Sequence, residues 1–187
     1  MPFLLIPLGA LFLALVWAVA NYNVLVRLRN QCREAWADVQ TELKRRYDLI
    51  PNLVETVKGY AKHEQETLDK VIEARNRAVA STGTPETQAR DENALAGSLR
   101  QLFALSEGYP DLKANTNFLQ FQSEMANTED RIQAARRLYN ANVRDLNTRT
   151  ELFPSNLVAG MFGFAKRDFF DAEPEASNVP TVDLSLG

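Results

Sequence analysis

The chain has 187 residues, a formal net charge of −3 and 24% charged residues. This length accommodates one domain and an anchor, and the lack of a basic excess argues against a nucleic-acid-binding protein. A single cysteine, Cys32, excludes an internal disulfide and a cysteine-rich metal site. A single histidine, His63, excludes the usual di-iron carboxylate bundle, which needs a Glu-x-x-His pair on each of two helices.

The N-terminal stretch is apolar and uncharged over residues 3–20. As a helix it reaches about 27 Å, which is enough to cross the hydrocarbon core of a bilayer. A cleaved signal peptide is the alternative, but it needs a positively charged start, which Met1 and Pro2 do not supply, and its apolar core is shorter. We therefore expect an uncleaved transmembrane anchor over residues 1–23.

Residues around the end of this run indicate how it meets the membrane. Trp17 and Tyr22 lie where an interfacial aromatic belt is expected. Arg27, Arg29 and Arg33 follow the run, and no basic side chain precedes it. The positive-inside rule then predicts a single-pass protein of the inner membrane, with its N-terminus outside and the rest of the chain in the cytoplasm.

After the anchor, apolar residues recur at alternating steps of three and four, which is typical of amphipathic helices. Neither glycine nor proline separates the anchor from the first such helix, so we expect one continuous helix there. The predicted fold is all-α: a transmembrane helix that continues into an antiparallel, up-down-up-down four-helix bundle over residues 24–152. The four bundle helices are expected at 24–47, 51–80, 86–107 and 117–150.

The first turn of the bundle is predicted at Pro51. A proline suits the first turn of a helix, because its missing N–H belongs to the donors that are unpaired there anyway. We therefore expect one helix to end near Tyr47 and the next to begin near Pro51. The alternative is one long helix kinked at Pro51, since the turn has no glycine. A charged cluster at this turn is interpreted as a solvated tip, or as a contact for a phosphate-bearing partner; it comprises Glu42, Lys44, Arg45, Arg46 and Asp48.

Two polar residues interrupt the apolar seam of the last bundle helix. Thr128 and Asn142 occupy seam positions between apolar neighbours. We interpret them as register-setting hydrogen-bonding residues inside the bundle. The other interpretation is a small polar binding site.

The C-terminal part begins with a helix break at Phe153 and Pro154. In an up-down-up-down bundle the last helix returns to the membrane, so residues 153–167 are expected to form a short apolar segment at the lipid surface. Its candidate interface residues are Leu157, Met161, Phe162, Phe164, Lys166 and Arg167. Docking on the bundle or on a neighbouring copy is the alternative. Residues 168–187 are acidic without a basic residue and are expected to be mostly disordered.

One long stretch of the sequence resembles a known family. EAWADVQTELKRRYDLIPNLVETVKGYAKHE, preceded by NYNVLVRLRN and followed by EARNRAV and FPSNLVAGMFGF, is similar to the bacterial LemA family. The resemblance extends over nearly all of residues 21–164. It implies a membrane-anchored antiparallel helical bundle, and it assigns no catalytic residue and no cofactor.

No motif in the chain indicates an enzyme. The sequence has no Walker loop, no GxGxxG, no GxSxG and no histidine placed to serve a serine or cysteine nucleophile. His63 with Glu64 and Glu66 lies in an exposed, charged turn and is interpreted as solvated surface. We therefore expect no cofactor and no metal site.

The function predicted from these observations is a non-enzymatic interaction or scaffolding module held at the membrane surface. Its expected partners are the lipid bilayer and either a second copy or another membrane-associated protein, because four large aromatic residues exceed what a narrow seam needs: Trp36, Tyr60, Phe103 and Tyr109. The alternative is a small-molecule sensor that signals through the membrane helix. That function requires a polar pocket around Thr128 and Asn142.

Overall fold

The computed structural model describes the backbone of residues 2–170 and the side chains of residues 6–170. Within that range the chain is all-helical and has no strand, as the sequence predicts. The six helices are α1 (Pro2–Lys58), α2 (Gln65–Ala80), α3 (Pro85–Ser106), α4 (Pro110–Lys113), α5 (Thr116–Glu151) and α6 (Ser155–Met161).

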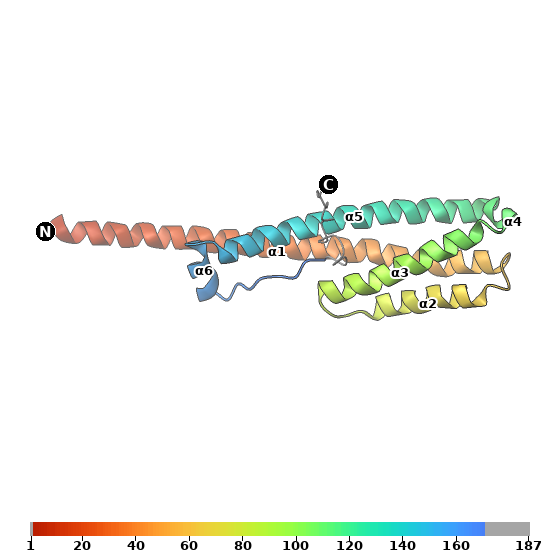
Figure 1. Cartoon of the computed structure of the whole chain (residues 1–187). Helices are drawn as coiled ribbons and strands as arrows, with labels where there is room; N and C mark the ends of the chain where they lie inside the picture. The colour runs from red at the N-terminus through yellow and green to blue at the C-terminus, as the bar shows by residue number, and fades with distance from the viewer. Residues whose placement is uncertain (1, 171–187) are drawn as a thin grey trace, which may run out of the picture.

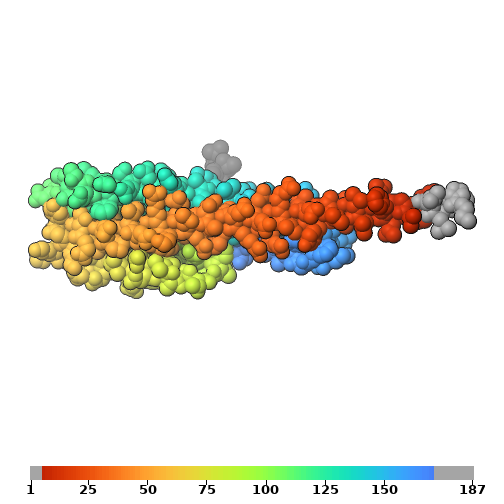
Figure 2. Space-filling view, turned by 180° about the vertical axis from the view of Figure 1, so that it is seen from behind, coloured from red at the N-terminus to blue at the C-terminus, as the bar shows by residue number. Residues whose placement is uncertain are grey.

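Helix α1 combines the apolar run and the first helix of the packed domain without interruption. Its 57 residues give a length of about 85 Å at 1.5 Å per residue. Figure 2 shows that its N-terminal part projects beyond every other element. The large apolar side chains of this part, from Ile6 to Val19, are exposed. Among the described residues, α1 is the one helix long and apolar enough to cross a membrane, judged by length and composition.

The predicted turn between Tyr47 and Pro51 is wrong. The alternative of one long helix is correct only in that the helix continues through Pro51, because a turn over residues 59–64 still separates α1 from α2. Helix α1 passes through Pro51 and ends at Lys58, and α2 begins only at Gln65. A proline inside a helix leaves the carbonyl four residues earlier without its N–H donor. Here that carbonyl, on Tyr47, accepts a hydrogen bond of 3.2 Å from Nε of Arg75 on α2. A tertiary contact thus replaces the missing helical bond.

The other long helices pack around α1 (Figure 1). Helix α5 runs back along α1 toward its N-terminal end, and the α2–α3 hairpin lies beside the C-terminal half of α1. The core is formed by the apolar seams that the sequence predicts, including Leu25, Val39, Leu53, Val71, Leu95, Leu102, Phe118, Ile132 and Leu146. Asn115 caps α5 by accepting a hydrogen bond of 3.0 Å from the N–H of Phe118.

The end of the described chain folds back onto the domain. Helix α6 follows α5 closely, and residues 165–170, called the strap below, run in extended form along α5. Phe170 is only 1% exposed. The acidic tail expected from Asp168 therefore begins with three residues that are part of the packed structure. The disorder predicted for residues 171–187 lies outside the described residues.

Candidate membrane-proximal surface and inter-helix groove

Helix α6 is held tightly against the end of α5. The hydroxyl of Ser155 donates to the carbonyl oxygens of Arg149 and Leu152, both at 2.8 Å. Arg149 lies in the last turn of α5, where carbonyls lack a helical donor, and the carbonyl of Leu152 also accepts a hydrogen bond of 2.8 Å from the N–H of Asn156. Val158 and Ala159 on α6 are buried in the core. The chain therefore turns sharply after α5 and presents one face of α6 to the domain.

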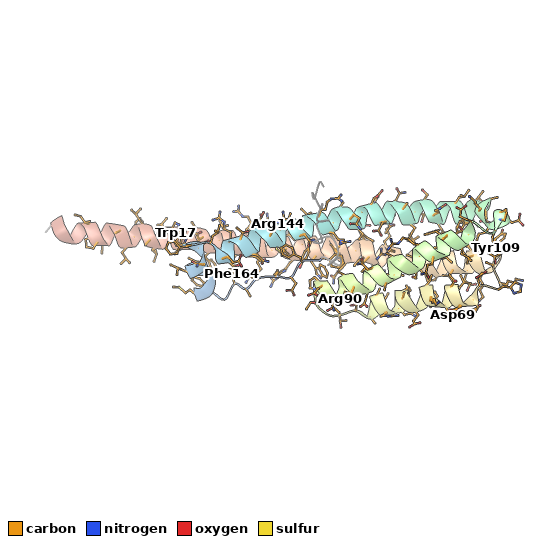
Figure 3. All side chains as sticks on the ribbon, in the orientation of Figure 1. Trp17, Asp69, Arg90, Tyr109, Arg144 and Phe164 are labelled. Carbon is orange, nitrogen blue, oxygen red and sulfur yellow. The ribbon has the colours of Figure 1, made fainter. Side chains whose placement is uncertain are left out.

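Aromatic contacts place α6 beside the start of the packed part of α1. The ring centroid of Tyr22 lies 4.8 Å from that of Phe162 and 5.8 Å from that of Phe164. The guanidinium of Arg29 lies 5.1 Å from the centroid of the Phe164 ring, a cation–π distance. In Figure 3, Trp17 and Phe164 lie at one end of the domain and Tyr109 at the other. Helix α6 thus meets α1 directly after the apolar run.

The outer face of this end is apolar and exposed. Phe153 is 78% exposed and Met161 is 79% exposed, and Leu157 and Phe162 are also exposed. We call these four side chains the membrane-proximal surface. Scattered exposed apolar residues are ordinary in proteins, but a cluster next to an apolar span is typical of a binding surface.

The basic candidate residues are not gathered on this surface. Arg27 is exposed, whereas the guanidinium of Arg29 packs on the ring of Phe164. Lys166 forms an ion pair with Glu151. The backbone N–H and carbonyl of Arg167 each bond to the side chain of Asn147, at 2.9 Å. The structure therefore brings Phe162 and Phe164 together at Tyr22. Lys166 and the backbone of Arg167 are bonded to α5 instead.

A buried ionic network joins three helices in the centre of the domain. Arg46 on α1 is 3% exposed and pairs with Glu92 on α3, and its Nη1 also lies 2.8 Å from Glu129 on α5. The hydroxyl of Tyr47 donates to the other oxygen of Glu92. Burial raises the pKa of Glu92, and the charge of Arg46 offsets part of that rise. The interpretation of Arg46 as part of a solvated tip is thus wrong.

A groove of about 550 Å³ lies next to this network, between α1, α3 and α5. Its apolar lining includes Leu99, Phe103, Met125 and Ile132, and the polar lining includes Arg46, Glu92, Arg100 and Arg136. Phe170, at the end of the strap, lines it as well. This combination of apolar walls and a few charged groups is typical of a binding groove.

The two polar seam residues of α5 do not line the groove. Thr128 is buried and donates to the carbonyl of Glu124 in its own helix, so its expected role between helices is wrong. Asn142 does link two helices, because its Nδ2 donates to the carbonyl of Gln31 on α1 at 3.2 Å. No group of three or more metal-ligating side chains lies together within the part of the chain that the structure describes.

The groove and its ionic network were not predicted, although the sequence carries a signal for them. Glu92 occupies a seam position of α3, three residues before Leu95 and seven before Leu99. Arg46 occupies a seam position of α1, three residues after Leu43. Opposite charges on two seams predict a buried pair, since an unpaired charge is rarely buried.

Comparison with known proteins places the chain in a family. The model of the LemA family matches residues 35–184. The chain is also 32% identical over 171 residues to Protein LemA of Metamycoplasma hominis, a match that covers 89% of this chain and 76% of that protein. The chain belongs to the LemA family. The part of this LemA family member that the family model matches includes the strap and the groove, and it excludes the apolar run of α1.

More distant relatives are magnetosome proteins. Magnetosome protein MamQ 1 of Paramagnetospirillum magneticum is 24% identical over 191 residues, covering 89% of this chain and 70% of that protein. Magnetosome protein MamQ of Magnetospirillum gryphiswaldense is 22% identical over 187 residues, covering 87% and 68%. These matches extend over most of the present LemA family member.

Proposed function

We propose that this LemA family member is a non-enzymatic, single-pass membrane protein whose helical domain is an interaction or scaffolding module at the membrane surface. The observation that carries the proposal is the position of α6 beside Tyr22, directly after the apolar run, with Phe153 and Met161 exposed. The apolar run crosses the inner membrane with its N-terminus outside, and the domain lies in the cytoplasm.

Apolar burial supplies most of the attraction between α6 and lipid. Fully burying a large apolar side chain contributes about 1.5–3 kcal/mol, and a basic residue near anionic headgroups contributes about 1 kcal/mol. Lys166 is already paired with Glu151, so Arg27 is the main basic contributor. The membrane-proximal surface therefore binds lipid through Phe153, Leu157 and Met161.

An up-down-up-down bundle is the topology that suits this position. Helix α5 runs back along α1 (Figure 1), so Leu152 and α6 are delivered to the end of the domain where α1 leaves the apolar run. The start of the packed part of α1 and the segment after α5 thereby meet the membrane at the same end of the domain. The long outer faces of α2, α3 and α5 remain available for other proteins.

The test of the membrane position uses the full chain reconstituted in vesicles. Met161→Cys carries an environment-sensitive fluorophore, and Ala104→Cys, an exposed position on α3, carries the same fluorophore as the matched control. Native Cys32 is buried and stays unlabelled. We expect a lipid-borne quencher to quench the label at position 161 and to leave the label at position 104 unchanged. Equal quenching at both positions would contradict the proposed position of α6.

The scaffolding part of the proposal concerns a second copy or another protein. All four aromatic residues that motivate self-association have contacts inside the chain. Trp36 packs on Tyr139 and Phe103 on Phe118, whereas Tyr109 donates to Glu64 and the hydroxyl of Tyr60 accepts from Asn115 at 2.9 Å. The proposed association thus rests on the helix surfaces. Native mass measurement after gentle detergent extraction is expected to give a complex heavier than the 21.1 kDa chain. A chain recovered only as a monomer would remove the scaffolding proposal.

The sensor alternative is less well supported. It requires a polar pocket around Thr128 and Asn142, and both side chains are absent from the groove lining, with bonds to Glu124 and Gln31 instead. We therefore retain the interaction module as the proposed function.

A further inference from the structure

The strap is fixed to α5 by a regular series of hydrogen bonds. Asn147 bonds to the backbone of Arg167, and Asn140 bonds to the backbone N–H and carbonyl of Phe170 at 2.9 Å and 3.2 Å. Between them, the hydroxyl of Tyr139 donates to the carbonyl of Asp168 at 2.9 Å. The three steps from Arg167 to Phe170 advance the extended strap by about 10 Å, and the seven steps from Asn147 to Asn140 cover the same distance along α5. The strap therefore runs straight along α5, away from α6.

The strap leads directly into the groove. Phe170 is buried against Trp36, at 5.4 Å between ring centroids, and lies 5.3 Å beneath the guanidinium of Arg136. Both Phe170 and Arg136 line the groove. The groove then continues along α5 toward Gln122, in the direction that the strap already follows. Residues 171–187 begin at this point.

The length of chain that follows is sufficient to fill the groove. Arg136 and Gln122 are about 21 Å apart along α5. Seventeen extended residues reach about 55 Å, so residues 171–187 are long enough to follow the whole groove without being fully extended.

The chemistry of this segment complements the groove. It has four acidic residues and no basic one, in the order Asp171, Glu173, Glu175 and Asp183. The groove is lined by the guanidinium groups of Arg46, Arg100 and Arg136 and by two carboxylates, Glu92 and Glu129, which both pair with Arg46. In addition, Nε of buried Arg46, which also lines the groove, has no hydrogen-bond acceptor among the described residues. A carboxylate is the acceptor that a buried guanidinium prefers.

The second half of the segment matches the apolar walls. Val179, Val182, Leu184 and Leu186 are spaced by small or polar residues. Leu99, Phe103, Met125 and Ile132 supply apolar surface along the groove. Burial of these side chains against each other removes apolar area from water, which is the main favourable contribution to such docking.

We propose that residues 171–187 dock in the groove between α1, α3 and α5 of the same chain, with their acidic part toward Arg136 and Arg100. The segment is then an intramolecular ligand that covers a groove with both apolar walls and charged groups. The inference does not depend on the proposed membrane position of α6. Any other partner of this groove has to displace the segment.

The test compares the full chain in detergent with a chain that ends at Phe170. The probe is a fluorescein-labelled peptide of residues 171–187, and binding is measured by fluorescence anisotropy. We expect the shortened chain to bind the peptide and the full chain not to bind it. Arg100→Glu in the shortened chain is expected to weaken binding at least about tenfold, because attraction becomes repulsion. Arg90→Glu, the same charge reversal on an exposed part of α3 outside the groove (Figure 3), is expected to leave binding unchanged.

A second variant covers the case in which the shortened chain does not fold. In the full chain, Asp171→Lys, Glu173→Lys and Glu175→Lys together are expected to release the groove and allow the peptide to bind. The proposal would be overturned if the full and shortened chains bound the peptide equally, or if neither the shortened chain nor the triple lysine variant bound it. It would also be overturned if Arg100→Glu had no effect on binding. A full chain that is dimeric while the shortened chain is monomeric would also overturn it, since the segment would then occupy a second copy.

Discussion

Nε of Arg75 on α2 donates a hydrogen bond of 3.2 Å to the carbonyl oxygen of Tyr47 on α1. This carbonyl is the one that Pro51 leaves without a helical donor. The contact satisfies an acceptor in the middle of α1 and fixes α2 at the same point. The passage of α1 through Pro51 and the docking of the α2–α3 hairpin are therefore coupled.

Loss of this contact is expected to destabilise the domain. Arg75→Ala leaves the Tyr47 carbonyl without its donor, and a hydrogen bond from a charged group contributes about 1.5–3 kcal/mol. Arg77→Ala on the same helix removes only an exposed pair with Glu73, which contributes about 0–1 kcal/mol. Urea unfolding in detergent, followed by circular dichroism, measures both free energies of unfolding.

The Pro51→Ala background provides the decisive comparison. An alanine supplies the N–H that Tyr47 lacks, so Arg75→Ala is expected to cost less there than in the parent chain. Equal costs in the two backgrounds would show that Arg75 does not act through the Tyr47 carbonyl.

The seam of α1 is tested by two neighbouring residues. Leu43 is 1% exposed, whereas the side chain of Lys44 is largely exposed and pairs with Asp48. Leu43→Asp puts an unpaired charge into the core and is expected to cost several kcal/mol, and Lys44→Asp is expected to change the unfolding midpoint little. Thermal unfolding of both variants measures the difference. Similar losses would mean that the buried face of α1 is assigned incorrectly.

The buried Glu92 predicts a pH dependence of stability. Burial raises its pKa above the ordinary value of 4.5. A carboxyl whose pKa is higher in the folded state contributes stability below its unfolded pKa, and this contribution is lost as pH rises through the folded pKa. We therefore expect the free energy of unfolding of the parent chain to fall, relative to Glu92→Gln, as pH rises from 4.5.

Chemical denaturation of both chains at a series of pH values measures this difference. Glu86→Gln removes an exposed carboxylate from the same helix and is the matched control variant. A constant difference between the parent chain and Glu92→Gln across the range would contradict the raised pKa.

The single thiol is expected to be unreactive in the folded protein. Cys32 is fully buried, and burial raises its pKa, so little thiolate forms near neutral pH. Intact-mass measurement after treatment with a maleimide is expected to show no adduct in the native state and one adduct after unfolding. Met161→Cys provides the positive control, with one adduct in the native state, because position 161 is exposed.

The sequence alone was sufficient to predict which face each long helix buries. Apolar residues at steps of three and four mark Leu25, Val39 and Leu43 on α1 and Phe118 and Ile132 on α5, and all are buried. The reason is local, since the helical repeat alone decides which side chains share a face. A continuous uncharged stretch over residues 3–20 identified the apolar run of α1, and long family-specific motifs identified the LemA family.

The position of the first turn was decided by tertiary structure. Local sequence rules predict a helix start at Pro51. They do not account for a hydrogen-bond donor 28 residues from Tyr47 along the chain, which here is Nε of Arg75. The strap was decided in the same way: Phe170 belongs to an acidic stretch without periodicity, yet Asn140 and Trp36 bury it. Hydrogen bonds and burial between distant residues can outweigh local propensity by a few kcal/mol. Where such contacts occur depends on which segments the folded chain brings together.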